Sequence, residues 1–328
     1  MGSGSPPRRR VNTHTRMKRT DAASFSKSIL LTHARGLARI CALASTFFVA
    51  DGSSATILHA RMIILTQVIQ LSLTPLQREI EKQRARLSSS EVEERRDAVT
   101  RLGAMARPDS SRVVALALND AAVIVRATAA RAVLSLPANE AAAALLPLLR
   151  DKNEFVRRET AYALGQTRSR TAVEALATAL ARDKEAGVRG AAAVALGQIG
   201  DESAVPVLTE AIGRRIARSG FLNRITFRRT EENEFVRRSS AVALGQIKSS
   251  AAVPALITVL NNERAGDDVR REAARSLGLI GDPAAISSLT AVLTARDPYL
   301  AQIAAEALAR LEPKVIQSIV REGEGQHR

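Results

Sequence analysis

Arginines recur at a fixed place in the sequence, directly after a position that valine fills in most copies of a repeated pattern. Acidic residues recur five positions before the same valine position. Because a guanidinium group binds a carboxylate through two parallel hydrogen bonds, we expect a stack of Arg–carboxylate pairs at turns between helices. An anion-binding stripe is the alternative interpretation. The arginines are Arg95, Arg126, Arg157, Arg189, Arg237 and Arg270, and the acids are Asp120, Asp151, Asp183 and Glu231.

A second group of chemically active side chains lies in an insert, residues 213–230, which holds six arginines, several apolar residues and no acid. Insertions between repeats map to one face of a solenoid. We interpret the insert as a basic amphipathic hairpin or helix that binds an acidic protein or an anionic membrane surface. The alternative is a solvated loop whose apolar residues pack on the adjacent repeat. The candidate partner-binding residues are Arg214, Arg215, Arg218, Phe221, Arg224, Phe227, Arg228 and Arg229.

Nucleic acid is a weaker candidate partner, because two aromatic residues make a thin platform for stacking bases. The charge distribution agrees: residues 1–90 carry 14 basic and 4 acidic residues, out of 48 basic and 33 acidic in the whole chain. Without these residues and the six arginines of the insert, the remainder has a net charge of −1. The repeats therefore do not form a generally basic surface.

Catalytic and metal-binding residues are scarce. The only histidines are His14, His33, His59 and His327, and the only cysteine is Cys41. This excludes an intramolecular disulfide, a four-cysteine zinc site and Cys/His nucleophilic catalysis within the repeats. The sequence contains neither a dinucleotide-binding nor a Walker-type glycine motif. We therefore predict no catalytic residue, no metal or other cofactor and no small-molecule substrate.

The segments that carry these recurring arginines and acids are copies of one repeating sequence unit. A leucine or valine recurs with spacings of 31, 31, 32, 48, 33 and 31 residues, and the long spacing contains the insert. The marking residues are Leu102, Val133, Leu164, Leu196, Leu244, Leu277 and Leu308. With 46% hydrophobic but only 3% aromatic residues, the core must consist of Ala, Leu, Val and Ile, which favours helices over a β-sandwich.

Each unit divides into two helices. The second helix begins after an N-cap residue, Asn153, Asn233 or Asp297, and is expected to stop at Gly165, Gly197, Gly245 or Gly278. The next helix begins after Ser169, Asp201, Ser249 or Asp282, and the column Gln166, Gln198 and Gln246 is expected in loops. The apolar stripe of the helix that begins after these four residues contains the pairs Leu176/Leu180, Leu208/Ile212, Leu256/Leu260 and Leu289/Leu293. Such pairs bury their stripes only by stacking, so we predict an all-α solenoid of about seven helical hairpins.

The repeat pattern, seen most clearly in 187–208 and 268–289, resembles the HEAT-like repeats of the phycobilisome-lyase type. The resemblance covers residues 91–311 and implies an armadillo-type superhelix. That superfamily includes scaffolds, chromophore lyases, deoxyhypusine hydroxylases and DNA glycosylases. The His-Glu pairs that hold iron in the hydroxylases are missing here. We expect a non-catalytic scaffold or adaptor that binds proteins; the alternative is an enzyme or enzyme subunit of the bilin-lyase or hydroxylase kind.

The N-terminal part has a different composition. Residues 1–55 are predicted to be a disordered basic leader, and their apolar run 40–50 has the length of a signal-peptide core. This favours export to the periplasm or cell envelope, with a cytoplasmic protein as the alternative. Residues 56–90 are predicted to be a helical or linker segment, and 312–328 a C-terminal tail. Within 56–90, Thr74 and Pro75 predict the start of a charged helix over 76–87.

Overall fold

Paired helices form nearly all the regular structure in the part of the chain described here. The computed structural model describes residues 73–217 and 229–325, with side chains at 73–214 and 232–311. The predicted leader, apolar run 40–50 and most of the insert lie outside these residues. The chain divides into two units, Met1–Glu79 and Ile80–Arg328. The first unit contributes only residues 73–79 to the description, which include the beginning of α3 (Pro75–Arg86).

The second unit is a series of helix pairs. The first helices of the pairs after α3 are α5 (Pro108–Val114) with η1 (Ala115–Asn119), α7 (Ala138–Leu145) with η3 (Leu146–Arg150), α9 (Val173–Arg182), α11 (Val205–Gly213), α14 (Val253–Asn261), and α16 (Ile286–Ala291) with η8 (Val292–Thr294). The second helices are α4 (Val92–Ala104), α6 (Val123–Ala132), α8 (Glu154–Thr167), α10 (Ala186–Ile199), α13 (Glu234–Ile247), α15 (Asp267–Ile280) and α17 (Pro298–Gly325). Short 3₁₀ segments connect the pairs: η2 (Val133–Ser135), η4 (Arg170–Ala172), η5 (Glu202–Ala204), η6 (Ser250–Ala252) and η7 (Pro283–Ala285).

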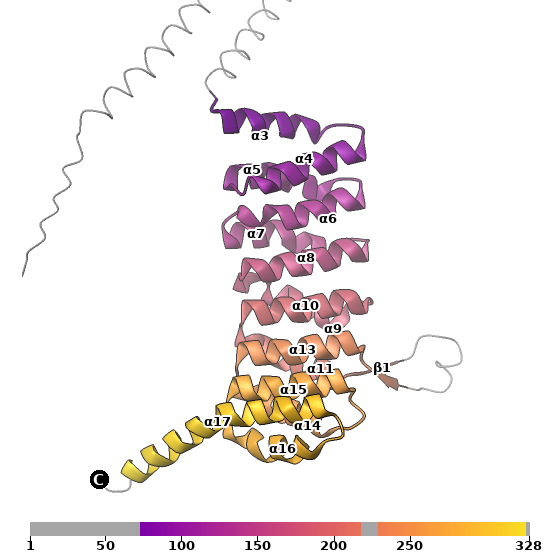
Figure 1. The fold of residues 1–328 in the computed structure, drawn as a ribbon. Coiled ribbons are helices and arrows are strands. Elements are labelled where there is room, and N and C mark those ends of the chain that lie inside the picture. Colours follow the sequence, from indigo (N-terminus) through magenta and orange to yellow (C-terminus); the bar gives the residue numbers. More distant parts are fainter. Residues whose placement is uncertain (1–72, 218–228, 326–328) are drawn as a thin grey trace, which may run out of the picture. The chain divides into compact units, whose positions relative to one another are not determined.

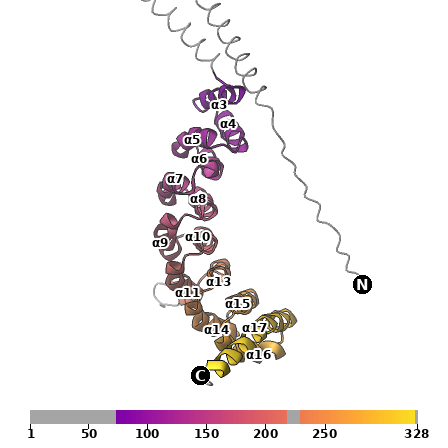
Figure 2. The ribbon, with the colours of Figure 1, turned by 90° about the vertical axis from the view of Figure 1, so that its left-hand side faces the viewer.

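The helices form two rows. Each second helix packs against the second helix of the next pair, and the first helices α9, α11 and α14 pack in the same successive order. Figure 2 separates the two rows, with α7, α9 and α11 in one and α8, α10 and α13 in the other. A helix pair of this kind buries its apolar side only against its neighbours. The predicted all-α solenoid is confirmed.

The core between the rows is built from aliphatic side chains, as the composition predicts. Leu164, Leu176, Leu196 and Leu208 are fully buried. The predicted apolar stripe is buried in α9, α11 and α14. The prediction is wrong at Leu293, whose side chain is 39% exposed. The reason is that Leu293 lies in η8, a tighter helix that no longer keeps the i, i+4 alignment with Leu289.

Capping residues fix where the helices begin. The side chains of Asn153 and Asn233 each accept a hydrogen bond from the backbone N–H two residues later, at 2.9 Å. Asp297 does the same for Tyr299 at 3.1 Å. In the first unit, Thr74 and Gln77 form a reciprocal cap: Gln77 Oε1 accepts from the Thr74 N–H at 2.9 Å, and Thr74 Oγ1 accepts from the Gln77 N–H at 3.2 Å. These helix starts agree with the predicted ones.

The predicted helix ends are wrong by about one turn. Gly165, Gly197, Gly245 and Gly278 lie inside α8, α10, α13 and α15, which end instead in left-handed caps. The capping residues are Arg168 (φ 53°), Gly200 (φ 73°), Lys248 (φ 59°) and Gly281 (φ 74°). The glutamine column is misplaced for the same reason: Gln166, Gln198 and Gln246 are exposed residues of these helices and not loop residues.

The four internal glycines allow successive second helices to approach closely. A Cβ atom on Gly197 would lie 2.7 Å from the Ala243 Cα of the next second helix, and one on Gly165 would lie 2.7 Å from the Ala195 Cα. Real Cβ contacts are almost never this short, so any side chain would push the two helices apart. The glycine column therefore sets the spacing of the row of second helices.

In the described residues, no helix combines the length and the apolar character that a membrane crossing requires.

Candidate functional site

The turns that lead from each first helix into its second helix all lie at one edge of the second unit, which we call the turn edge. Its described residues are 120–122, 151–153, 183–185, 214–217, 229–233, 262–266 and 295–297. Because each repeat has the same orientation as the one before it, equivalent turns stack on one another. Figure 1 shows the strand β1 (Arg215–Ala217) leaving at this edge, beside the beginning of α13. The arginine and acid columns and the insert therefore meet here.

The turn edge contains the expected stack of Arg–carboxylate pairs. Arg157 donates from Nε to Asp183 Oδ2 at 2.7 Å and from Nη2 to Asp183 Oδ1 at 2.9 Å. Its remaining Nη1 donates to the carbonyl oxygens of Asp151 and Lys152, at 3.0 and 3.3 Å. The guanidinium group thus joins its own turn to the next one. The same arrangement holds for Arg95 with Asp120 and for Arg126 with Asp151.

The carboxylates of this stack are partly removed from water and well satisfied. Hydrogen bonds from Arg95 lower the pKa of Asp120. Burial raises the pKa of Asp151 and of Asp183, but the facing arginine and a backbone N–H outweigh it, so the pKa of each is lowered. Arg157 and Asp183 side chains are only 8% and 9% exposed. The arginines and aspartates of the stack therefore bind each other, which fits a structural role.

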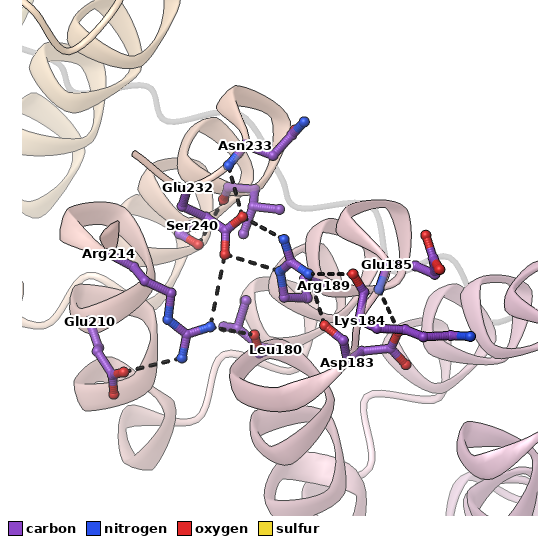
Figure 3. Close-up of polar contacts among 11 residues, drawn as sticks. Leu180, Asp183, Lys184, Glu185, Arg189, Glu210, Arg214, Glu232, Asn233 and Ser240 are labelled. Atoms are coloured by element: carbon purple, nitrogen blue, oxygen red, sulfur yellow. Dashed lines mark hydrogen bonds and ion pairs between the residues drawn. The ribbon is translucent and has the colours of Figure 1, made fainter. Parts of the chain in front are cut away.

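At the insert, the acid of the stack shifts by one residue. Glu232 replaces the predicted Glu231: Arg189 Nη2 donates to Glu232 Oε1 at 2.6 Å and Arg189 Nε to Glu232 Oε2 at 3.0 Å (Figure 3). The physical reason is the base of the insert, where β1 pairs antiparallel with β2 (Arg229–Glu231). The pairing places Glu231 in the strand and leaves the next residue, Glu232, to reach Arg189. The Glu232 side chain is fully buried.

Arg214 also belongs to this structural cluster. It occupies the C-cap of α11, where Asp183 caps α9 with nearly the same backbone angles. Its guanidinium lies 3.8 Å from Glu232 Oε2 and donates to Glu210 at 3.1 Å, and only 18% of its side chain is exposed (Figure 3). Arg214 therefore serves the base of the insert, contrary to its prediction as a partner-binding residue. The side chains of Arg215, Arg218, Phe221, Arg224, Phe227, Arg228 and Arg229 lie outside the described ones.

The stack changes at the arginines of α13 and α15. Arg237 donates to the carbonyl oxygens of Ile212 and Ala265, both at 3.0 Å. Arg270, predicted to pair with an acid, donates from Nε to the Leu260 carbonyl at 3.0 Å, because Ala295 stands at the C-cap position that Asp151 occupies earlier. Arg271 forms the bidentate pair instead, with Asp297 at 2.7 and 2.9 Å.

Sequence reasoning missed a set of basic residues in two consecutive turns. Each turn has the sequence Arg-Asp-Lys, and its aspartate is the one that pairs with an arginine of the stack. The flanking side chains are exposed and form no ion pair among the described residues. The repeated tripeptide was visible in the sequence and could have revealed them. They are Arg150 and Lys152 in one turn and Arg182 and Lys184 in the next.

The aromatic side chains were also overlooked. In the described part of the chain, none of them is fully buried: Phe155 and Tyr162 are half-buried and pack against the core, whereas Phe235 is 36% and Tyr299 65% exposed. Phe155, Phe235 and Tyr299 stand in the first turn of their second helices, and so at the turn edge. The Arg271 guanidinium lies 5.2 Å from the Tyr299 ring centroid. Exposed aromatics beside arginines are typical of protein interfaces.

Among the described residues, no three His, Cys, Asp or Glu side chains lie close enough together to hold a metal ion. The four histidines and Cys41 lie outside that part of the chain. What the described turn edge offers chemically is a series of cations and exposed aromatic rings.

Comparisons with known proteins agree with the repeat architecture. The family model for HEAT repeats matches residues 143–218 and 224–309. No curated protein sequence matches the chain.

The chain is similar, to different degrees, to three solved structures. YibA from Escherichia coli has 19% sequence identity and a TM-score of 0.50, with 81% of this chain and 99% of that chain covered. The CpcE–CpcF complex of a Nostoc phycocyanin lyase has 23% identity and a TM-score of 0.43, covering 72% and 87%. Human deoxyhypusine hydroxylase has 20% identity and a TM-score of 0.35, covering 87% and 98%. With its repeated helix pairs and the matching family model, the chain is a HEAT-repeat protein.

Proposed function

We propose that this protein is a non-catalytic scaffold or adaptor that binds an acidic protein partner at its turn edge, with the insert as a major contact. One observation carries the proposal: the arginine-rich insert enters and leaves at the turn edge, where β1 and β2 pair and the buried Glu232 ties their base to Arg189. These contacts hold the base of the insert at the turn edge. Binding surfaces of repeat proteins are built from side chains spread over several repeats.

Charge favours an acidic partner over other classes. The insert contains no acid to neutralise its arginines. The aspartates of the neighbouring turns are already paired with Arg126 and Arg157, so they do not offset those charges either. Such a surface attracts an acidic partner at long range and positions it with bidentate contacts.

The non-catalytic part of the proposal rests on the sequence of the repeats, residues 91–311, which contain neither histidine nor cysteine. Most carboxylates of the Arg–carboxylate stack are held by arginine partners, so they are poorly placed to transfer protons. Iron or a tetrapyrrole bound to the purified protein would contradict it. Export, proposed from the apolar run 40–50, is a separate question, which N-terminal sequencing of the mature protein answers.

The insert is tested by replacing its arginines with serine and capturing partners from the native cell. Arg214 stays unchanged, because it supports the base of the insert. We expect the variant to retain much less partner at moderate salt and to keep the melting temperature of the wild type. The replaced residues are Arg215, Arg218, Arg224, Arg228 and Arg229.

The control variant is Arg214→Ser, which should lower the melting temperature because Glu232 and Glu210 lose a cation. Unchanged capture by the five-residue variant would remove the insert from the proposal. Binding of the wild-type protein to vesicles with anionic lipids, but not to any protein, would replace the acidic protein by a membrane surface.

A further inference from the structure

A hollow on the row of first helices lies next to the two Arg-Asp-Lys turns. It lies between α7 with η3 on one side and α9 on the other, and its volume is about 790 Å³. Aliphatic side chains and small residues line most of it, so it can accept apolar groups without displacing the core. The residues that matter below are Ala143, Leu146, Pro147, Ala175 and Ala179.

One end of this hollow is basic. Arg150 and Arg182 line it, and each is the last residue of its helix, at the turn edge. Both guanidinium groups are exposed, and neither has a hydrogen-bond or ion-pair partner among the described residues. Lys152 and Lys184 follow two residues later in the same turns and are exposed as well.

The acids of the region leave these cations unneutralised. Asp183 also lines the hollow, but its carboxylate is held by Arg157 at 2.7 Å. Glu174 also lines the hollow, but it lies in the first turn of α9, at the opposite end of that helix from Arg182. Glu154 and Glu185 begin or precede the following second helices. The hollow therefore combines an aliphatic floor with free arginines at one end.

We infer that this hollow binds an amphipathic acidic segment of a protein partner. Its apolar side chains enter between η3 and α9, and its carboxylates pair with Arg150 and Arg182. The charge of the rim selects an acidic segment, because each of the two arginines can hold a carboxylate through two parallel hydrogen bonds. The next turn begins the insert at Arg214, so the same partner can contact both surfaces. The inference rests on the proposed protein-binding function but does not require the insert.

The test uses the full chain and a defined probe, a fluorescent 12-residue peptide in which pairs of Leu alternate with Asp-Glu pairs. A second peptide has Asn and Gln in place of every Asp and Glu. Fluorescence anisotropy should show binding of the acidic peptide that weakens with salt, and little binding of the neutral one. The double substitution Arg150→Gln with Arg182→Gln should weaken binding by about tenfold or more, because two charge-assisted contacts are lost.

Two controls separate charge from position. Arg275→Gln with Arg310→Gln removes the same charge elsewhere and should leave the affinity within about twofold, because exposed distant charges are screened. Ala143→Trp fills the hollow from an exposed position and should abolish binding without changing the net charge.

The results also distinguish this inference from the proposed function. The variant in which five arginines of the insert are replaced by serine should still bind the acidic peptide. Equal binding of both peptides, no binding by the wild type, or full affinity in the Arg150/Arg182 variant would overturn the inference. Capture of the native partner through the insert would still stand in each of these cases.

Discussion

Single side chains at the turn edge join one repeat to the next. Asp151 accepts two hydrogen bonds from Arg126 of the preceding repeat and one from the N–H of Asn153 in its own turn. Its carbonyl oxygen accepts from Arg157 at 3.0 Å. One residue thus holds two guanidinium groups from successive second helices. Removing its charge leaves Arg126, whose side chain is 15% exposed, without its carboxylate.

Asp151→Asn is therefore expected to reduce the free energy of unfolding by about 2 kcal/mol, because a mostly buried arginine loses its counter-charge. Urea unfolding followed by circular dichroism measures the change. The matched control is Asp109→Asn, which breaks an exposed pair with Arg112 at 3.0 Å and should change stability by less than about 0.5 kcal/mol. Equal effects of the two substitutions would mean that an ion pair of the stack stabilises the fold no more than an exposed ion pair does.

The same carboxylates predict how stability depends on pH. The pKa values of Asp120, Asp151 and Asp183 are all lowered in the folded chain. A lowered pKa means that the unfolded chain binds protons first, so the contribution is complete above about pH 5 and is lost as the pH falls through the folded values. The melting temperature should fall on acidification below about pH 4. Asp151→Asn should make this fall smaller, and an identical pH profile would contradict the assignment.

At this scale the sequence predicted the pairing but not every partner. Counting from the valine column identified Arg126, Arg157, Asp151 and Asp183 as members of the stack, because those turns have equal lengths; which arginine pairs with which acid came from the structure. It gave Glu231 in place of Glu232, because counting cannot see how strand pairing takes up residues. It gave Arg270 a role that Arg271 has, because the final acid, Asp297, lies two residues later than the usual position.

At the scale of the helix, close packing of the second helices depends on small residues. In α10, Gly197 faces Ala243 of α13, whereas Gly187, in the first turn, has only the Arg158 Cδ nearby, 3.7 Å from where a Cβ would lie. The two glycines share one helix and differ strongly in the space around them. They therefore separate the effect of packing from that of helix propensity.

Gly197→Ala should lower the free energy of unfolding by about 1–3 kcal/mol, because the new methyl group overlaps α13. Gly187→Ala should be neutral or stabilising by up to about 0.5 kcal/mol, since alanine favours the helix and meets an ordinary contact. Urea unfolding of both variants measures the difference. Equal stabilities would show that the glycine column does not set the spacing.

Helix beginnings could be predicted from the sequence and helix ends could not. An N-cap such as Asn153 is identified by its own side chain, which bonds to the helix it begins. A glycine, in contrast, can either end a helix or admit a neighbouring one, and only the packed structure shows which. The true ends at Arg168 and Lys248 use left-handed residues that are not glycine, so composition did not mark them.

For the whole molecule, the repeat period predicted the solenoid, because stacking is the way for copied helix pairs to bury their apolar sides. The candidate binding surface was less accessible to prediction. Its insert was visible as one long spacing, but the hollow beside Arg150 and Arg182 depends on how two first helices pack. Spacing along the chain carries no information on the width of such a gap.

Hydrogen–deuterium exchange of the full chain, alone and saturated with the partner captured from the native cell, tests the central claim most directly. Binding at the turn edge predicts slower exchange in 150–153, in 182–185 and in the insert, 213–230. Exchange at the opposite turns, near Arg168, Gly200 and Lys248, should not change. Protection at those opposite turns with none at the turn edge would contradict the account.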